Sequence, residues 1–138
     1  MIKSSSVRLK TEGNCDVIDI TSRVTHELES SGIKNGLVTV FVSGSTAGIT
    51  TIEYEPGLVE DLKIAFNRIA PGNIHYEHNK KWGDGNGHAH VRASLLGSSL
   101  VVPLIDGQMT LGTWQQIVLV DFDNRPRNRE IIVQVTGD

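Results

Sequence analysis

The chain has 138 residues, a formal net charge of −3 at pH 7 and only 5% aromatic residues. A chain of this length is expected to form a single domain, residues 1–138, with a hydrophobic core of its own. Nucleic-acid binding depends on a basic surface and on aromatic side chains that stack on bases. This composition therefore argues against a nucleic-acid partner.

The sequence also argues against a membrane partner and an oxidising compartment. No segment has the apolar length needed to span a bilayer, and the first ten residues lack the apolar stretch of a secretory signal. Cys15 is the single cysteine, so no disulfide can form within the chain. We therefore expect a cytoplasmic protein.

In chain order, the first segments predict two strands and a helix. Residues 4–10 alternate in character and residues 15–20 form a second, largely apolar segment, so both are predicted to be strands. Thr21 is suited to cap a helix that continues to Glu29 and stops at Gly32.

The next segments predict two more strands and a second helix. The β-branched residues 36–43 and residues 47–54 are predicted strands, separated by a turn at Gly44. Pro56 is suited to the start of a helix, because its fixed φ and missing N–H are tolerated there. Apolar residues then recur at helical spacing and form one face: Leu58, Leu62, Ala65, Phe66 and Ile69.

The second half is predicted to be rich in strands. Residues 71–86 are polar and are predicted to be irregular. Residues 98–105 and 111–122 are predicted strands that flank a tight turn at residues 106–108, and residues 129–137 form the last strand. Because no helices separate these three strands, we predict an α+β fold with a largely antiparallel sheet rather than a doubly wound parallel one.

Residues 83–97, GDGNGHAHVRASLLG, place two histidines after a glycine-rich loop. A strand would put His88 and His90 on one face, whereas a helix would put them about 200° apart. The good helix formers that follow favour the helix, with Asp84 or Asn86 available to cap its start.

The predicted helix should end at Gly97 in a left-handed conformation, with Val91 and Leu95 forming an apolar ridge toward the core. The free N–H groups and partial positive charge of its first turn favour anions. We therefore expect a phosphate group on the amides of residues 85–88, with the histidines as hydrogen-bond donors or proton carriers.

The same histidines are candidates for a metal site. A transition-type dication needs neutral imidazoles and usually at least three protein ligands. The candidate ligands are His75, His78, His88 and His90, with oxygens from Glu53, Glu77 or Asp84. The pattern matches no metalloenzyme signature such as H-E-x-x-H, so an ordinary polar helix start is the alternative.

Two further segments have both a functional and a structural interpretation. Ser45 and Thr46 in SGSTAG are suited to line an anion pocket, but they could equally form an ordinary turn, and the segment lacks the ending of a nucleotide P-loop. Trp114 is predicted to anchor the core or a subunit interface. The alternating residues Arg125, Arg127 and Arg129 could bind phosphate or form a solvated hairpin paired with nearby aspartates.

Five segments together resemble the YjbQ-like family, whose members are commonly labelled secondary thiamine-phosphate synthase. They are GSTAGITTIEYEPGLVEDL, YEHN, GDGNGHAHVRASLLGSSLVVPLIDG, LGTWQQIVLVDFD and RPRNREIIVQV. The resemblance runs from about Val7 to the end of the chain. It implies an α+β fold built around a large, bent, mostly antiparallel β-sheet with a few helices, assembled as a homotrimer.

The resemblance further implies that one pocket is surrounded by polar residues: Thr46, Glu53, Asp61, His78, Asn79, Asn86, His88, His90, Gln115 and Arg129. The catalytic candidates are Glu53, Asp61, His78 and His88. The ligand-binding candidates are Ser45, Thr46, Asn79, Asn86, Gly87, His90, Gln115 and Arg129. The metal candidates are His78, His88 and His90. Many members carry a histidine where this chain has Gly44, so a metal shell that needs that histidine would have one ligand fewer here.

Two functions follow as expectations. The first is an enzyme that joins a pyrimidine diphosphate to a thiazole phosphate and releases pyrophosphate, as a main or a side activity, with a divalent ion such as Mg²⁺ or Zn²⁺. In that reaction Glu53 or Asp61 would hold the cation, His78 would be the acid–base group, and His88 and His90 would contact the leaving group. The second is a trimeric protein that binds a metal or a small phosphorylated metabolite without efficient catalysis.

Overall fold

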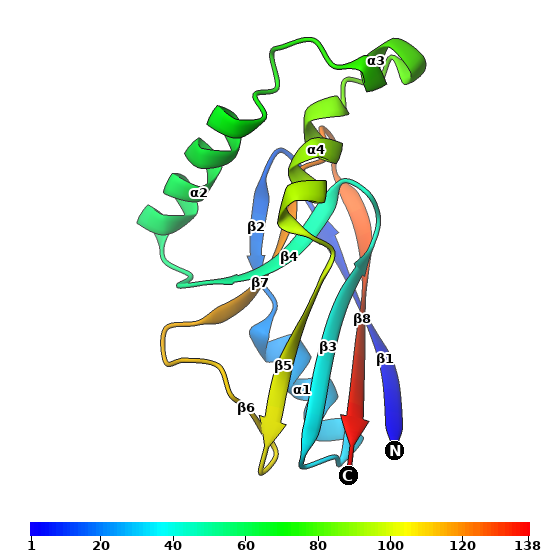
Figure 1. Ribbon diagram of the computed structural model, residues 1–138, viewed down its shortest axis with the longest axis vertical. Coiled ribbons are helices and arrows are strands. Elements are labelled where there is room, and N and C mark those ends of the chain that lie inside the picture. Colours follow the sequence, from blue (N-terminus) through cyan, green and yellow to red (C-terminus); the bar gives the residue numbers. More distant parts are fainter.

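The computed structural model describes residues 1–138, which form eight strands and four helices (Figure 1). The strands are β1 (Ile2–Thr11), β2 (Asp16–Asp19), β3 (Gly36–Ser43), β4 (Ala47–Ile52), β5 (Ser99–Ile105), β6 (Gln108–Met109), β7 (Gln116–Asp121) and β8 (Arg127–Gly137). The helices are α1 (Thr21–Ser31), α2 (Pro56–Ile69), α3 (Glu77–Trp82) and α4 (Gly87–Leu96). No helix combines the length and the apolar character that crossing a membrane requires.

The strands form two sheets that follow one another around a curved β-structure. One sheet has the order β1-β8-β3-β5-β6 and the other has the order β2-β7-β4, and every pairing is antiparallel. Residues 44–46 carry the chain from β3 to β4, and residues 122–126 carry it from β7 to β8. These two crossings lie side by side, because Phe122 N donates to the Thr46 carbonyl. The predicted α+β fold with an antiparallel sheet is confirmed.

The core has two parts. The larger cluster lies between the sheets and α1, which contributes Val24 and Leu28. The smaller cluster lies under α2 and α4, where Phe66 of α2 packs edge-to-face on Phe122 with ring centroids 4.7 Å apart. Apolar burial of this kind is the main force that holds helices onto sheets. It fixes α4, and hence the histidines, against the end of β7.

Local signals set several element boundaries as expected. Gly32 ends α1 with φ 72°, and Pro56 opens α2, where the Glu55 side chain accepts hydrogen bonds from the first-turn amides. Thr21 is not the cap of α1; Ile20 is, and the Thr21 hydroxyl instead donates to Asp19 Oδ1 and accepts from the Ile117 amide.

The segments around residues 71–86 and 111–122 differ from the predictions. The polar segment contains α3, a six-residue helix that ends at Gly83 with φ 65°. The predicted strand 111–122 is shorter, because residues 112–115 form a turn in which Gln115 N donates to the Gly112 carbonyl. Trp114 lies in this turn with 72% of its surface exposed, so it does not anchor the core of the chain.

Helix α4 forms as predicted, but its buried face is different. Val91 is 40% exposed and Leu95 is 62% exposed, so these residues do not form the predicted inward ridge. The helix packs through Ala89 and Ala93, whose small side chains let it approach β4 and β7 closely. Arg92 lies on the same buried face, where its Nε donates to the Ala70 carbonyl at the end of α2.

Candidate functional site

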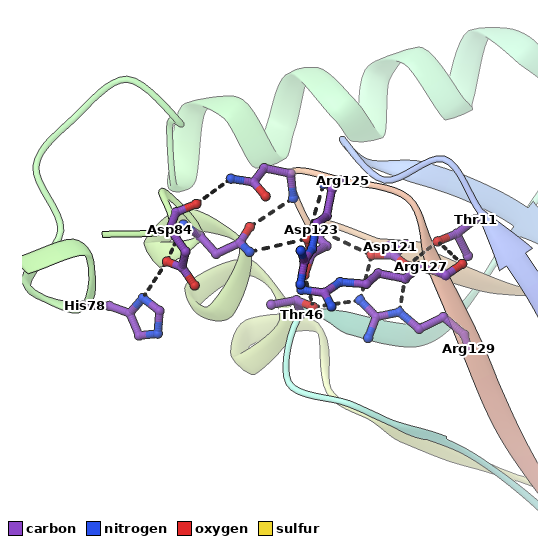
Figure 2. A network of polar contacts seen from close by, with 11 residues as sticks. Thr11, Thr46, His78, Asp84, Asp121, Asp123, Arg125, Arg127 and Arg129 are labelled. Atoms are coloured by element: carbon purple, nitrogen blue, oxygen red, sulfur yellow. Dashed lines mark hydrogen bonds and ion pairs between the residues drawn. The ribbon is translucent and has the colours of Figure 1, made fainter. Parts of the chain in front are cut away.

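Buried charges gather where the chain crosses between the two sheets (Figure 2). Asp121 ends β7 with none of its surface exposed, and Arg129 of β8 is 7% exposed. Arg129 Nε lies 2.7 Å from Asp121 Oδ2 and Nη2 lies 2.8 Å from Oδ1, so the pair is bidentate. The hydroxyl of Thr11 donates to Asp121 at 2.6 Å, and Arg129 Nη2 donates to Thr46 Oγ1 at 2.6 Å. The predicted solvated arginine hairpin is therefore wrong at Arg129.

A second buried carboxylate, Asp123, extends this network toward α4. Its Oδ2 lies 3.0 Å from Arg127 Nη2 and accepts from the Thr46 hydroxyl at 2.9 Å, and its Oδ1 accepts from Asn86 Nδ2 at 3.3 Å. Burial acts to raise the pKa of Asp123, but hydrogen bonds from Arg127, Thr46 and Asn86 outweigh it and lower the pKa below its usual value. Two carboxylates are thus matched by two guanidinium groups through charge-assisted hydrogen bonds, which favour the ionised form of Asp123.

Side chains of this chain already accept hydrogen bonds from backbone amides at the start of α4. Asn79 of α3 accepts a hydrogen bond from Gly87 N through Oδ1 at 2.9 Å, and Asp84 Oδ1 accepts from Asn86 N at 3.2 Å. Asn86 makes no capping bond; its Oδ1 accepts from Asn124 N at 2.9 Å. Two of the amides predicted to hold an anion are therefore already occupied, and the carboxylate of Asp84 beside them disfavours a negative ligand.

Only two of the three predicted metal-binding histidines lie together. The rings of His78 and His90 lie 4.2 Å apart between centroids, and His78 Nδ1 lies 3.6 Å from Asp84 Oδ1. His88 points the other way around α4, with its ring next to Gly72 and 6.4 Å from the Tyr76 ring centroid. Within one chain, no group of three or more His, Cys, Asp or Glu side chains is arranged to hold a metal ion.

The environment favours neutral imidazoles at α4. Burial lowers the pKa of His88, and the positive charge of Arg92 lowers it further. Burial also lowers the pKa of His90, with a further contribution from His78. Both rings therefore stay uncharged at neutral pH, and each offers one donor and one acceptor nitrogen.

Beside His90 the surface is hollowed into a cavity of about 260 Å³. It lies between the β3–β4 crossing and α4 and is lined by Gly44, Ser45, Ala47, His90, Ala93, Ser94, Gly97 and Ser98. None of these residues is acidic. The hydroxyl of Ser94 donates to the His90 carbonyl, whereas the hydroxyls of Ser45 and Ser98 make no hydrogen bond within the chain. The lining is thus suited to a ligand with several acceptor atoms.

Three predicted site residues lie elsewhere in the chain. Glu53 follows the far end of β4, which is about 16 Å from its Ala47 end at the usual rise per residue. Gln115 donates to Thr51 Oγ1 at that same far end, and Asp61 is exposed on α2. A single chain therefore brings together His78, Asn79, Asn86, Gly87, His90, Ser45, Thr46 and Arg129, but not Glu53, Asp61 or Gln115.

The sequence analysis did not identify Asp121 and Asp123 as the centre of the site. Asp121 directly follows four consecutive buried apolar residues within β7, and Asp123 lies two positions further on. The sequence alone predicts these aspartates only as surface partners of the arginines. The signal for a buried role is that arginines able to pair with them follow at residues 127 and 129, because a buried Asp needs a paired charge.

Comparison with known proteins places this arrangement in a family. Residues 5–138 match the sequence model described as "UPF0047 protein YjbQ-like". The chain belongs to this family. A UPF0047 protein of Methanothermobacter thermautotrophicus is 43% identical over 136 residues, covering 99% of this chain and 93% of that protein. The UPF0047 protein YugU of Bacillus subtilis is 33% identical, covering 96% and 98% of the two chains.

Solved structures of family members have the same fold. A YbjQ-like protein of Sulfolobus solfataricus superposes with a TM-score of 0.90 at 35% identity, covering all of both chains. A hypothetical protein of Aeropyrum pernix superposes with a TM-score of 0.92 at 34% identity, covering 99% of each. The two-sheet architecture that positions the buried charges of this chain is thus shared by these two solved structures.

The buried ion pair predicts a large difference between two charge-removing substitutions. Asp121→Asn leaves Arg129 buried and unpaired, and we expect it to lower the free energy of unfolding by about 3–5 kcal/mol. Glu130→Gln removes the partner of Arg8 in a pair whose side chains are 80% and 38% exposed, and should cost about 1 kcal/mol or less. Urea denaturation followed by circular dichroism measures both. Equal losses in the two variants would show that the buried network does not hold the sheets together.

The neutral histidines predict a defined pH dependence. Because the folded-state pKa values of His88 and His90 lie below the ordinary 6.5, the unfolded chain takes up protons first as the pH falls. The free energy of unfolding should therefore be highest above about pH 6.5 and decrease between pH 6.5 and the lower folded-state values. Urea titrations at pH 7.5 and 5.5 measure the decrease. It should shrink in the His88→Asn/His90→Asn double variant, and an unchanged decrease would assign it to other groups.

Proposed function

We propose that this UPF0047 protein binds a small phosphorylated ligand in the cavity beside His90 and has a weak thiamine-phosphate synthase-type activity. The observation that supports the proposal is the pair of adjacent imidazoles, His78 and His90, of which His90 lines a cavity without acidic residues. Neutral imidazole N–H groups and serine hydroxyls donate hydrogen bonds to phosphate oxygens. The resemblance to proteins labelled secondary thiamine-phosphate synthase supplies the reaction.

In that reaction a C–N bond forms between the pyrimidine methylene carbon and the thiazole nitrogen, and the C–O bond to pyrophosphate breaks. The leaving group carries away the bonding electron pair, so stabilising its developing charge is the main task of the protein. His90 and His78 are placed to donate to leaving-group oxygens. Asp84 Oδ1 lies 3.6 Å from His78 Nδ1 and places a negative charge beside that ring.

A divalent ion, Mg²⁺ or Zn²⁺, would supply further charge neutralisation for pyrophosphate. The residues of one chain do not fit this ion: His88 is turned away from His78 and His90, and no set of three ligands forms. Glu53 and Asp61, the carboxylates predicted to hold the cation, lie outside the cavity lining. No step of the proposed reaction is therefore assigned to a metal.

The distribution of charge favours a weak catalyst. Arg127 and Arg129 are paired with Asp123 and Asp121, so little positive charge is left to stabilise a departing pyrophosphate. The same observation supports a second candidate function, a phosphometabolite-binding protein without catalysis. Both functions require that the protein binds a phosphorylated ligand, and they differ only in whether the bound ligand is converted to product.

Kinetics separates the two functions. We expect the purified protein to bind thiazole phosphate and to form thiamine phosphate with kcat/KM well below about 10⁴ M⁻¹s⁻¹, the lower end of the usual range for enzymes. His90→Ala should weaken binding and turnover together, because it removes a donor from the cavity. His26→Ala on the exposed face of α1 is the matched control and should change neither. A value above 10⁴ would make the chain a dedicated synthase, and binding without any product would favour the second candidate.

We further propose that the protein is a homotrimer in which neighbouring chains complete the site. Support comes from the exposed side chains of Val91, Leu95 and Trp114, and from the remote positions of Glu53, Asp61 and Gln115. Light scattering should give a mass near three chains of 15.1 kDa. Mixing His90→Ala with Glu53→Gln subunits should restore part of the activity if two chains share each site. A 15.1 kDa particle at micromolar concentration would contradict the assembly.

A further inference from the structure

Arg129 has one guanidinium nitrogen that the buried network does not use. Its Nε and Nη2 donate to Asp121, and Nη2 also donates to Thr46. Nη1 makes no hydrogen bond within the chain, although only 7% of the residue is exposed, and Figure 2 shows it at the outer side of the network. Nη1 is not one of the buried side-chain atoms that lack a partner, so this nitrogen is accessible at the surface of the network. An accessible guanidinium N–H that makes no bond within the chain is available to an acceptor atom of a ligand.

The backbone leaves this nitrogen uncovered at Gly44. A Cβ atom added at Gly44 would lie 2.6 Å from Arg129 Nη1, which is closer than side-chain carbons approach a neighbouring atom. Gly44 also lines the cavity beside His90, together with Ser45 and Ser98. The missing side chain thus leaves Nη1 of Arg129 next to a residue that lines the cavity, although Arg129 itself is not part of the lining.

We propose that Arg129 Nη1, reached past Gly44, and the hydroxyls of Ser45 and Ser98 form a subsite for one oxyanion group of the ligand, a phosphate monoester. This inference rests on the proposed binding function and names the group that anchors the ligand. The cavity lining contains three serines, one histidine and no carboxylate, so it presents mainly donors to an incoming group. Donors without a competing carboxylate select a phosphate oxygen over a cation.

The location of the subsite follows from the closed start of α4. Asn79 and Asp84 already occupy the amides of Gly87 and Asn86, so an anion there would displace two hydrogen bonds and face a carboxylate. On the Gly44 side, the bidentate pair with Asp121 does not use Nη1 of Arg129, and this third nitrogen keeps its capacity for a charge-assisted hydrogen bond. The anion is therefore held by β8 and the β3–β4 crossing, with His90 alongside it.

Isothermal calorimetry with inorganic phosphate, and separately with thiazole phosphate, at pH 7.5 tests the subsite. Gly44→Ala should weaken phosphate binding about tenfold or more, because its methyl group covers Nη1 and removes a charged hydrogen bond. Ser45→Ala should weaken it less and gives a test that does not alter a glycine. The control is Gly32→Ala, which also has positive φ (72° against 151° at Gly44) but places its Cβ in open space. Thermal unfolding confirms that each variant folds.

The outcomes separate this inference from the proposed function. Phosphate binding that is weakened by Gly44→Ala and Ser45→Ala, and not by Gly32→Ala, supports the subsite. If both phosphates bind the wild type and all variants equally, the subsite is wrong while the binding function stands. If thiazole phosphate binds but inorganic phosphate does not, the subsite is also wrong. If neither binds the wild type, the proposed function fails together with the subsite.

Discussion

The bidentate pair between Asp121 and Arg129 is the interaction on which the arrangement of the molecule depends. It joins the end of β7 in one sheet to β8 in the other, at the point where the chain crosses between them. Thr11 donates a further hydrogen bond to Asp121, and Thr46 accepts one from Arg129 Nη2, so only Nη1 of the arginine has no partner within the chain. Buried charges are costly unless they are paired and hydrogen-bonded in this way. The pair consequently fixes how the two sheets meet.

The position of the histidines follows from the same network. Asp123, two residues after Asp121, binds the side chain of Asn86 at the start of α4, and Asn124 N donates to the same side chain. The α4 helix and His90 are therefore positioned by charges on the β7–β8 crossing, not by the glycine-rich loop that precedes the helix. Small residues on the buried face of α4 allow this close approach, which explains why its larger apolar residues face outward.

Local patterns were sufficient to predict most of the fold. As expected, α1 ends at Gly32, α2 begins at Pro56, and a turn at Asp106–Gly107, where both residues have positive φ, connects two strands. Each of these signals acts over only a few residues. The helix α3 was missed because a six-residue polar segment has no apolar period. Asn86 was predicted to cap its own helix, but its partner Asp123 is 37 residues away in sequence. A contact between residues so far apart in sequence cannot be predicted from a short segment of the chain. Contacts of this kind determine how the side chains of the site are arranged.

The polar groups around the site fall into two sets, one that stabilises the fold and one that is available to a ligand. Asp121 and Asp123 are paired with Arg129 and Arg127 in the buried network, so these four charges serve the fold. The groups left for the proposed ligand are serine hydroxyls, the imidazole of His90, whose pKa is lowered by burial, and a single unused arginine nitrogen. Such groups bind through directed hydrogen bonds more than through net charge, which suits recognition of one phosphate group better than the stabilisation of a departing pyrophosphate. This distribution of charge is why we propose binding, rather than efficient catalysis, as the main role of the site.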